Sequence, residues 1–262
     1  MFITSKENNE VKRIKKLYEK KYREQEMCFI VDGIKLVKEA IMENAIIEKI
    51  VFCKELLESN SQLADKEFVK EIEKFDCLEV SLNVFKYLSE VQNPQGILAI
   101  IKIDENKNKI LLNENLFLVL DEIQDPGNIG TIIRTADSAG IKQIICSPNT
   151  ADCYNSKVIR ATMGAIFRVN MIYVNDLLVT LDELKNNGIR ILATDLNATQ
   201  TIYETDFNKS AIIIGNEANG VSNNVLDISN EKIKIPMQGR AESLNAAIAT
   251  GIVIYEAKRP NR

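Results

Sequence analysis

The stretch Leu116-Phe117-Leu118-Val119-Leu120, with Asp125-Pro126-Gly127-Asn128-Ile129-Gly130-Thr131-Ile132-Ile133-Arg134 after it, decides the fold. Five apolar residues in a row predict a buried strand. The glycines and the asparagine that follow are typical of a chain that leaves a sheet and exposes backbone donors. Because ligands bind at such strand ends in α/β sheets, the stretch predicts a strand, a helix and part of a binding site.

Two later segments have the same form. Gly215-Asn216-Glu217-Ala218-Asn219-Gly220 comes after the apolar run Ala211–Ile214. Ile235-Pro236-Met237, which continues to Glu242-Ser243-Leu244-Asn245, comes at the end of the run Lys232–Ile235. Together the three segments predict one catalytic site built from loops at strand ends.

Strand-like and helix-like segments alternate from Leu116 to the C-terminus. Strands are expected at Leu116–Leu120, Gln143–Cys146, Val169–Tyr173, Arg190–Thr194, Ser210–Ile214 and Lys232–Ile235. Helices are expected at Gly130–Ala139, Ser156–Gly164, Asp176–Asn187, Ser222–Leu226 and Leu244–Ala257. Such alternation predicts an α/β fold with a mostly parallel sheet and helices on both faces.

The N-terminal part predicts a second, smaller α/β unit. Its strands are expected at Cys28–Val31, Ile46–Cys53, Leu78–Val80 and Gly96–Lys102, and its helices at Ile34–Glu43, Lys66–Lys74 and Asn83–Tyr87. The polar ends of the stretch Asp104–Asn115 are typical of a linker. The chain is therefore divided into residues 1–104, a linker at 105–115, and residues 116–262.

Composition excludes several classes of protein. Histidine is absent, which removes His triads, His general bases and His metal ligands. The five cysteines form no C-x-x-C pair, so no metal site is expected. The chain lacks a run of about 18 uncharged apolar residues and a secretory start, so we expect a cytoplasmic protein that does not enter a membrane. It also lacks the glycine signatures of P-loop and dinucleotide-binding proteins.

The first 27 residues are basic in a chain whose net charge is -4. Eight cations stand there against five acids. One interpretation is a solvated helix face with pairs such as Glu19 and Arg23. The other is contact with RNA phosphates.

Three polar side chains of the motifs carry alternative roles. Asn128 is expected to cap the helix that places Arg134 about one and a half turns inside it. Arg134 either pairs with Asp125, Asp137 or Glu217, or faces the cleft and holds a phosphate or ribose oxygen. Glu217 lies between two glycines, where a carboxylate can orient Arg134 or bind hydroxyls. The presence of all three motifs favours the functional role for Arg134.

The last motif precedes a long apolar helix. Ser243 is expected to cap this helix, whose apolar face is expected to pack inward. That face consists of Leu244, Ile248, Ile252 and Tyr255. Backbone groups around Ile235, Met237 and Leu244 are suited to hold the edge of an adenine.

The three segments resemble motifs one, two and three of the SpoU, or TrmH-like, branch of the SPOUT RNA methyltransferases. The resemblance consists of N-x-G-x-x-x-R at Asn128–Arg134, G-x-E-x-x-G at Gly215–Gly220, and I-P-M with S-L-N between Ile235 and Asn245. It covers roughly Leu116 to Lys258. The N-terminal part is similar to the ribosomal-protein-like substrate-binding domain of this family, through Phe29–Gly33 and Val37–Ala40.

The resemblance implies methyl transfer from S-adenosylmethionine to a ribose 2′-hydroxyl of RNA, without a metal. It implies a homodimer and a C-terminal trefoil knot, which general rules of chain topology make rare. The cofactor would contact Thr194, Gly215, Ile235, Met237 and Leu244. Arg134 would be the central catalytic residue, supported by Asn128, Glu217, Ser243 and Asn245.

Ribosomal RNA is favoured over transfer RNA because a separate substrate-binding domain is present, by analogy at the level of the fold. Two alternatives remain open. One is a catalytically silent RNA-binding protein of the same fold, and the other, remote, is a nicotinamide-dependent oxidoreductase.

Overall fold

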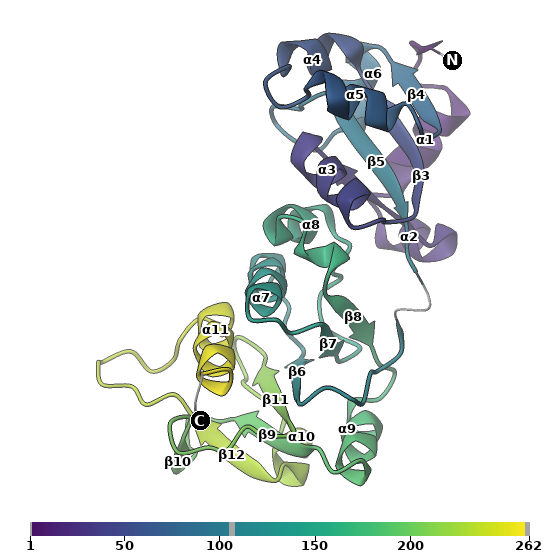
Figure 1. Cartoon of the computed structure of the whole chain (residues 1–262). Coiled ribbons are helices and arrows are strands. Elements are labelled where there is room, and N and C mark those ends of the chain that lie inside the picture. The colour runs from purple at the N-terminus through teal and green to yellow at the C-terminus, as the bar shows by residue number, and fades with distance from the viewer. Residues whose placement is uncertain (1, 105–107, 260–262) are drawn as a thin grey trace. The chain divides into compact units, whose positions relative to one another are not determined.

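The computed structural model describes residues 2–104 and 108–259 (Figure 1). The contacts between Cα atoms divide the chain into two compact units. The first unit is formed by residues 1–105 and 154–167, and the second by residues 106–153 and 168–262. Within the described residues, no helix combines the length and the apolar character needed to cross a membrane.

The first unit contains a five-stranded mixed sheet. The strand order is β1 (Phe2–Ile3), β4 (Cys77–Val80), β3 (Ile47–Phe52), β5 (Ile97–Lys102) and β2 (Cys28–Asp32). β1, β4 and β3 are parallel, whereas β5 is antiparallel to both of its neighbours. The helices of this unit are α1 (Asn9–Lys16), α2 (Lys20–Glu26), α3 (Ile34–Met42), α4 (Lys54–Ser59), α5 (Lys66–Ile72), α6 (Leu82–Leu88) and α8 (Ser156–Thr162).

The second unit contains a seven-stranded sheet in which every pair of neighbours is parallel. The order is β10 (Gln200–Thr201), β12 (Glu231–Lys234), β9 (Arg190–Thr194), β11 (Ser210–Gly215), β6 (Leu116–Asp121), β7 (Gln143–Cys146) and β8 (Asn170–Tyr173). Its helices are α7 (Pro126–Ser138), α9 (Leu177–Asn186), α10 (Asn223–Ile228) and α11 (Ala246–Ala257). The predicted parallel α/β sheet is confirmed.

Both faces of the sheet in the second unit are buried, because successive side chains of each strand point to opposite faces and both sets are apolar. Phe117 and Val119 join a core cluster that contains residues of α9 and α10. Leu118 and Leu120, which point to the opposite face, are also completely buried. α7 and α11 pack against each other, and α11 contacts β11. Strands buried on both sides explain why the sequence shows continuous apolar runs instead of alternation.

Several predicted elements have different limits in the structure. The strands Phe2–Ile3 and Gln200–Thr201 and the helix Lys54–Ser59 were not predicted, because such short segments carry too little periodicity. α7 begins at Pro126, four residues before the predicted start, because the Asp125 side chain accepts a hydrogen bond from the amide of Asn128. Asn128 is therefore not the cap of this helix, as the sequence had suggested.

The basic N-terminal segment folds as two helices separated by a break at residues 17–19. Arg23 is 4% exposed, and its Nη1 donates to the carbonyl oxygens of Leu17 and Tyr18 at distances of 2.9 and 2.6 Å. These carbonyl groups belong to the break itself. The interpretation of Arg23 as part of a solvated helix face is wrong, because its guanidinium satisfies backbone groups inside the protein.

Candidate active site

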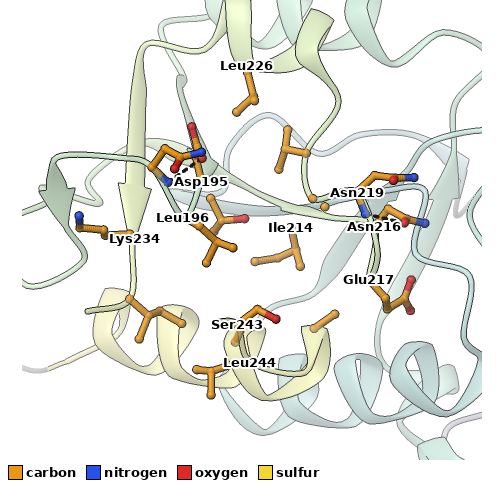
Figure 2. A pocket seen from close by; sticks show the side chains of 18 of the residues that line it. Asp195, Leu196, Ile214, Asn216, Glu217, Asn219, Leu226, Lys234, Ser243 and Leu244 are labelled. Carbon is orange, nitrogen blue, oxygen red and sulfur yellow. Dashed lines mark hydrogen bonds between the residues drawn. The ribbon is translucent and has the colours of Figure 1, made fainter. Parts of the chain in front are cut away.

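A cavity of about 530 Å³ opens at the carboxyl ends of β9, β11 and β12 (Figure 2). This volume is within the range of about 300–1,000 Å³ that is typical of small-molecule sites. Backbone, apolar and a few charged groups line it. The lining residues are Thr194–Asn197, Ile214–Val221, Asn223, Leu226, Ile233–Ile235, Met237, Ser243, Leu244, Ala246 and Ala249.

The loop after β11 owes its shape to Gly215. A Cβ atom on this residue would lie 2.0 Å from the amide nitrogen of Val221 and 2.1 Å from the carbonyl carbon of Gly220. The amide of Gly220 donates to the carbonyl of Asn216 at 2.9 Å, which closes the loop, and Gly220 has a φ of 70°. Only glycine at position 215 allows the backbone to turn back this closely.

The Glu217 carboxylate connects this loop to the loop that follows β6. Its Oε1 accepts hydrogen bonds from the amide of Asp125 (3.1 Å) and from Nδ2 of Asn128 (2.8 Å), and its Oε2 accepts one from the amide of Gln124 (3.2 Å). Partial burial works against ionisation, but these hydrogen bonds outweigh it and hold the pKa of Glu217 below its usual value. Glu217 is therefore an ionised acceptor and not a proton donor.

Asn128 extends this network to the third loop. Since its Nδ2 donates to Glu217, its Oδ1 is left to accept from Nδ2 of Asn245 at 2.8 Å. The Oδ1 of Asn245 in turn accepts from the amides of Ala247 and Ile248 and so caps α11. One chain of hydrogen bonds, Glu217–Asn128–Asn245, thus joins all three motifs. Its members lie up to 117 positions apart in the sequence.

The predicted site residues divide into those that line the cavity and those that support it. Glu217 and Ser243 line the cavity. So do all five residues expected to contact a cofactor, namely Thr194, Gly215, Ile235, Met237 and Leu244. Asn128 and Asn245 do not line the cavity, but they are hydrogen-bond partners in the network that includes Glu217. Ser243 is not the cap of the last helix, because α11 begins at Ala246 and Asn245 caps it.

Arg134 lies outside the cavity. It is an exposed residue of α7, roughly two turns after the start of the helix. No hydrogen bond or ion pair joins its side chain to another residue of the ranges 2–104 and 108–259. The three carboxylates considered as its partners have other contacts: Asp125 with the amide of Asn128, Asp137 with Arg168, and Glu217 with Asn128. The guanidinium of Arg134 is therefore available to a ligand.

The prediction that Leu244, Ile248, Ile252 and Tyr255 form the inward face of the last helix is wrong. Ile248 is 56% exposed and Tyr255 is 54% exposed, whereas Thr250, Val253 and Ile254 are buried. α11 is apolar on all sides, so the sequence pattern cannot indicate which side faces the core. The helix uses its small and β-branched side to pack inward.

Three further residues line the cavity although the sequence did not predict them, namely Asp195, Leu196 and Asn197. Figure 2 shows the first two of them at the cavity. All three come directly after β9, the strand between β11 and β12, so the rule for strand ends applies to them too. Lys234 at the end of β12 was missed as well. Asp195, Glu217 and Lys234 give the cavity two carboxylates and one ammonium. Within the described residues, no group of three Cys, Asp or Glu side chains is placed to hold a metal ion.

Comparisons with known proteins find similarity along most of the chain. The model of the SpoU rRNA Methylase family matches residues 115–255, and the MRM3-like substrate binding domain matches residues 8–99. The chain is 34% identical to the 23S rRNA (guanosine(2553)-2′-O)-methyltransferase RlmP of Bacillus subtilis, over 98% of each chain. An AdoMet-bound rRNA methyltransferase from Sinorhizobium meliloti matches with a TM-score of 0.85 and 32% identity, over 100% of this chain and 98% of that one. A crystal structure described as an RNA 2′-O ribose methyltransferase matches with a TM-score of 0.80 and 28% identity, over 98% of each chain.

Proposed function

This chain belongs to the SpoU rRNA methylase family, and on that premise we propose that its cavity binds S-adenosylmethionine for 2′-O-methylation of ribosomal RNA. The chain is an RNA 2′-O-ribose methyltransferase that depends on S-adenosylmethionine. The observation that carries the assignment of the cavity is that all five residues implied to contact the cofactor line it. The choice of ribosomal RNA over transfer RNA rests on the full-length similarity to RlmP.

The residues of the cavity fit this cofactor. S-Adenosylmethionine supplies an electrophilic methyl group on a positively charged sulfur. Asp195 and Glu217 supply negative charge that favours the cationic sulfonium and ammonium groups, and Lys234 can pair with a carboxylate. Ile235, Leu244 and Leu226 provide apolar walls, and the backbone around Gly215 provides hydrogen-bonding groups for a flat base.

Arg134 acts on the RNA and not on the cofactor in this proposal. Its exposed guanidinium donates to the ribose 2′-oxygen, orients it, and stabilises the negative charge that develops there. An arginine, with a pKa above about 12, does not accept the proton at neutral pH. The proton passes to a neighbouring phosphate oxygen of the RNA. Glu217 keeps the loops in place through Asn128 and Asn245.

The chain is proposed to work as a homodimer through the outer face of α11. Ile248, Ile252 and Tyr255 are spaced at i, i+4 and i+7, so they form one apolar stripe that the rest of the chain leaves exposed or only partly covered. α7, which carries Arg134, packs beside α11. A dimer on this face would bring Arg134 of one protomer toward the cavity of its partner, and this accounts for its place outside the cavity of its own chain.

We also propose that the segment after β12 is threaded as a trefoil knot. Its support is that β12 lies between β9 and β10, while α11 returns to pack against α7 and β11 on the other side of β9. Stretching a single molecule from both ends tests this. A knotted chain will extend less than about 3.5 Å per residue allows, and the full unknotted length would refute the proposal.

Methyl transfer to RNA tests the proposed function. The chain is incubated with labelled S-adenosylmethionine and total RNA from a strain that lacks its gene, and ribose methylation is mapped. One 2′-O-methylated site in ribosomal RNA is expected. A site in transfer RNA would correct the substrate. Absence of both incorporation and cofactor binding by calorimetry would favour the silent RNA-binding protein.

A further inference from the structure

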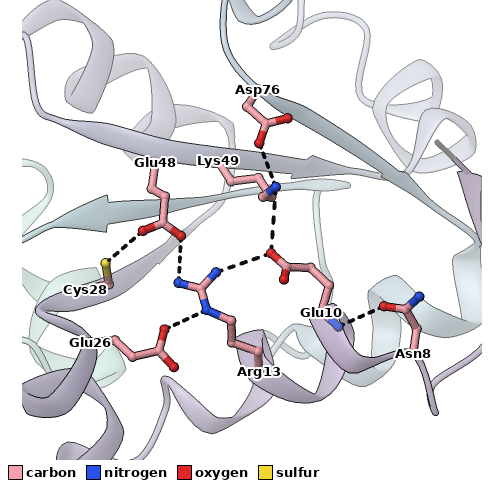
Figure 3. Close-up of polar contacts among 8 residues, drawn as sticks. All are labelled: Asn8, Glu10, Arg13, Glu26, Cys28, Glu48, Lys49 and Asp76. Atoms are coloured by element: carbon pink, nitrogen blue, oxygen red, sulfur yellow. Dashed lines mark hydrogen bonds and ion pairs between the residues drawn. The ribbon is translucent and has the colours of Figure 1, made fainter.

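The eight cations of the first 27 residues are not equivalent, because four of them bond to other groups of the protein. Arg13 bonds to Glu26 and Glu48 at 2.7 Å each and to Glu10 at 3.3 Å, as Figure 3 shows. Lys12 pairs with Glu7, and Lys20 pairs with Glu24. The fourth is the buried Arg23. Each of these four side chains therefore already has a bonding partner within the protein.

The other four cations lie over tyrosine rings instead. Lys6 and Lys15 lie 5.3 and 5.6 Å from the ring centre of Tyr87, and Lys15 also lies 4.8 Å from that of Tyr18. Lys16 and Lys21 lie 5.1 and 5.9 Å from the ring centre of Tyr22. None of these lysines has an ion pair with a carboxylate in the described residues. They remain charged and available to an anion.

Tyr87 gives this surface an exposed aromatic ring. It is 38% exposed on α6, which packs against α1, and Lys15 also approaches the carbonyl of Leu88 at 3.5 Å. Cations interleaved with aromatic rings are what proteins use to bind single-stranded nucleic acids. The rings stack on bases and the cations contact phosphates. An acidic peptide would use the lysines but would leave the ring without a role.

We infer that Lys6, Lys15 and Tyr87 form a binding site for a single-stranded segment of the RNA substrate, with an unpaired base stacked on Tyr87. Lys16 and Lys21 form a second lysine–tyrosine cluster around Tyr22 in the same N-terminal segment. The bases of a duplex are already stacked on one another, so the ring selects unpaired nucleotides. This inference rests on the proposed function and names the part of the RNA that the first unit holds.

Binding of the full chain to a 20-nucleotide oligouridylate, at several salt concentrations, tests the inference. Replacing both Lys6 and Lys15 by Gln should weaken binding and lower the slope of log affinity against log salt by about 1.4, or about 0.7 for each lost phosphate contact. The matched control replaces Lys12 and Lys20 by Gln, which removes the same charge from two carboxylate-paired lysines of the same N-terminal segment. Its slope should equal that of the wild type.

The role of the ring is tested separately. Tyr87→Leu should weaken oligouridylate binding about fivefold or more, whereas Tyr87→Phe, which keeps the ring, should bind like the wild type. A duplex of the same length should not distinguish these two variants. Equal salt slopes for both double variants, wild-type binding by Tyr87→Leu, or no oligouridylate binding by the wild type would each overturn the inference.

A kinetic measurement distinguishes a failure of this inference from a failure of the proposed function. The Lys6 and Lys15 double variant should raise the KM for RNA while kcat and S-adenosylmethionine affinity stay unchanged. The binding assay needs no turnover, so it decides the inference even if the wild-type chain transfers no methyl group.

Discussion

At the scale of single residues, the site is governed by a few side chains whose partners are far away in the sequence. Glu217 accepts from the loop after β6, and Asn245 reaches Asn128 from the start of α11. The residue types at these positions follow from hydrogen-bond chemistry, because only a carboxylate accepts all three donors that face position 217. Glycine is required at position 215 for a steric reason alone, because any Cβ atom there would overlap the backbone of Gly220 and Val221.

Gly215→Ala should strongly weaken the binding of S-adenosylmethionine. The new Cβ would overlap backbone atoms of Gly220 and Val221, so the loop after β11 must move. Calorimetry with S-adenosylmethionine should show at least a tenfold loss of affinity. Gly239→Ala is the matched control, since a Cβ there meets no atom within 4 Å, and it should bind like the wild type. Equal affinities for the two variants would contradict this account of the loop.

Glu217→Gln should destabilise the protein by about 1 kcal/mol near pH 7, because the amide presents a donor where the carboxylate only accepts. This value is below the range of about 1.5–3 kcal/mol for hydrogen bonds to charged groups, because the side chain is largely exposed and solvent screens it.

The sign of the pH dependence follows from the lowered pKa of Glu217. The stabilisation by the ionised carboxylate is complete when the pH is above the pKa of glutamate in the unfolded chain, about 4.3. It is lost as the pH falls through the lower pKa that Glu217 has in the folded state. Melting curves of both proteins between pH 3 and 8 should therefore converge at the acid end. A constant difference at all pH values would mean that the charge of Glu217 is not responsible.

At the scale of elements, α11 has two apolar faces, and only one of them is covered by its own chain. The covered face meets α7 and β11, and the other presents Ile248 and Tyr255. In the first unit, the ion pairs of Arg13 join three elements, namely α1, the end of α2 and β3 (Figure 3). Cys28 donates to Glu48 in that network, and burial raises the pKa of its thiol to about 12, so it stays protonated.

Ile248→Asp should convert the proposed dimer to a monomer in sedimentation experiments at micromolar concentration, because a charge on the apolar stripe would be buried without a partner. Val179→Asp is the control. Val179 is 55% exposed on α9, so the same change there should leave the oligomeric state unaltered. A wild-type chain that sediments as a monomer would refute the proposed interface.

At the scale of the whole molecule, the dimer proposal divides the site between two chains. Arg134→Ala should reduce kcat at least a hundredfold without weakening cofactor binding, since Arg134 does not line the cavity. Arg134→Lys keeps the charge but not the two-pronged donor and should recover only part of the activity.

Mixing two inactive variants tests whether Arg134 acts across the interface. In a random 1:1 mixture of Arg134→Ala and Gly215→Ala, half of the dimers are mixed, and each mixed dimer has one complete site of two. About a quarter of the wild-type activity should therefore return. No recovery, with mixed dimers demonstrated by mass, would mean that Arg134 serves the cavity of its own chain.

The sequence by itself determined the parallel sheet of the second unit and the place of the cavity. Continuous apolar runs predict strands buried on both sides, and loops at the ends of parallel strands meet at one edge. That reasoning depends on local pattern, and it pointed to the loops in which Gly215, Ile235 and Leu244 line the cavity. It would also have found Asp195, had it been applied to the end of β9.

Only the tertiary structure decided which groups meet. The exposed face of α11, the position of Arg134 outside the cavity and the partners of Glu217 depend on contacts between segments that lie about a hundred residues apart. A helix that is apolar on all sides has no periodic signal for its inward face, and an arginine has no local feature that names its partner. Packing and long-range hydrogen bonds settle both, because buried surface and satisfied polar groups are properties of the folded chain as a whole.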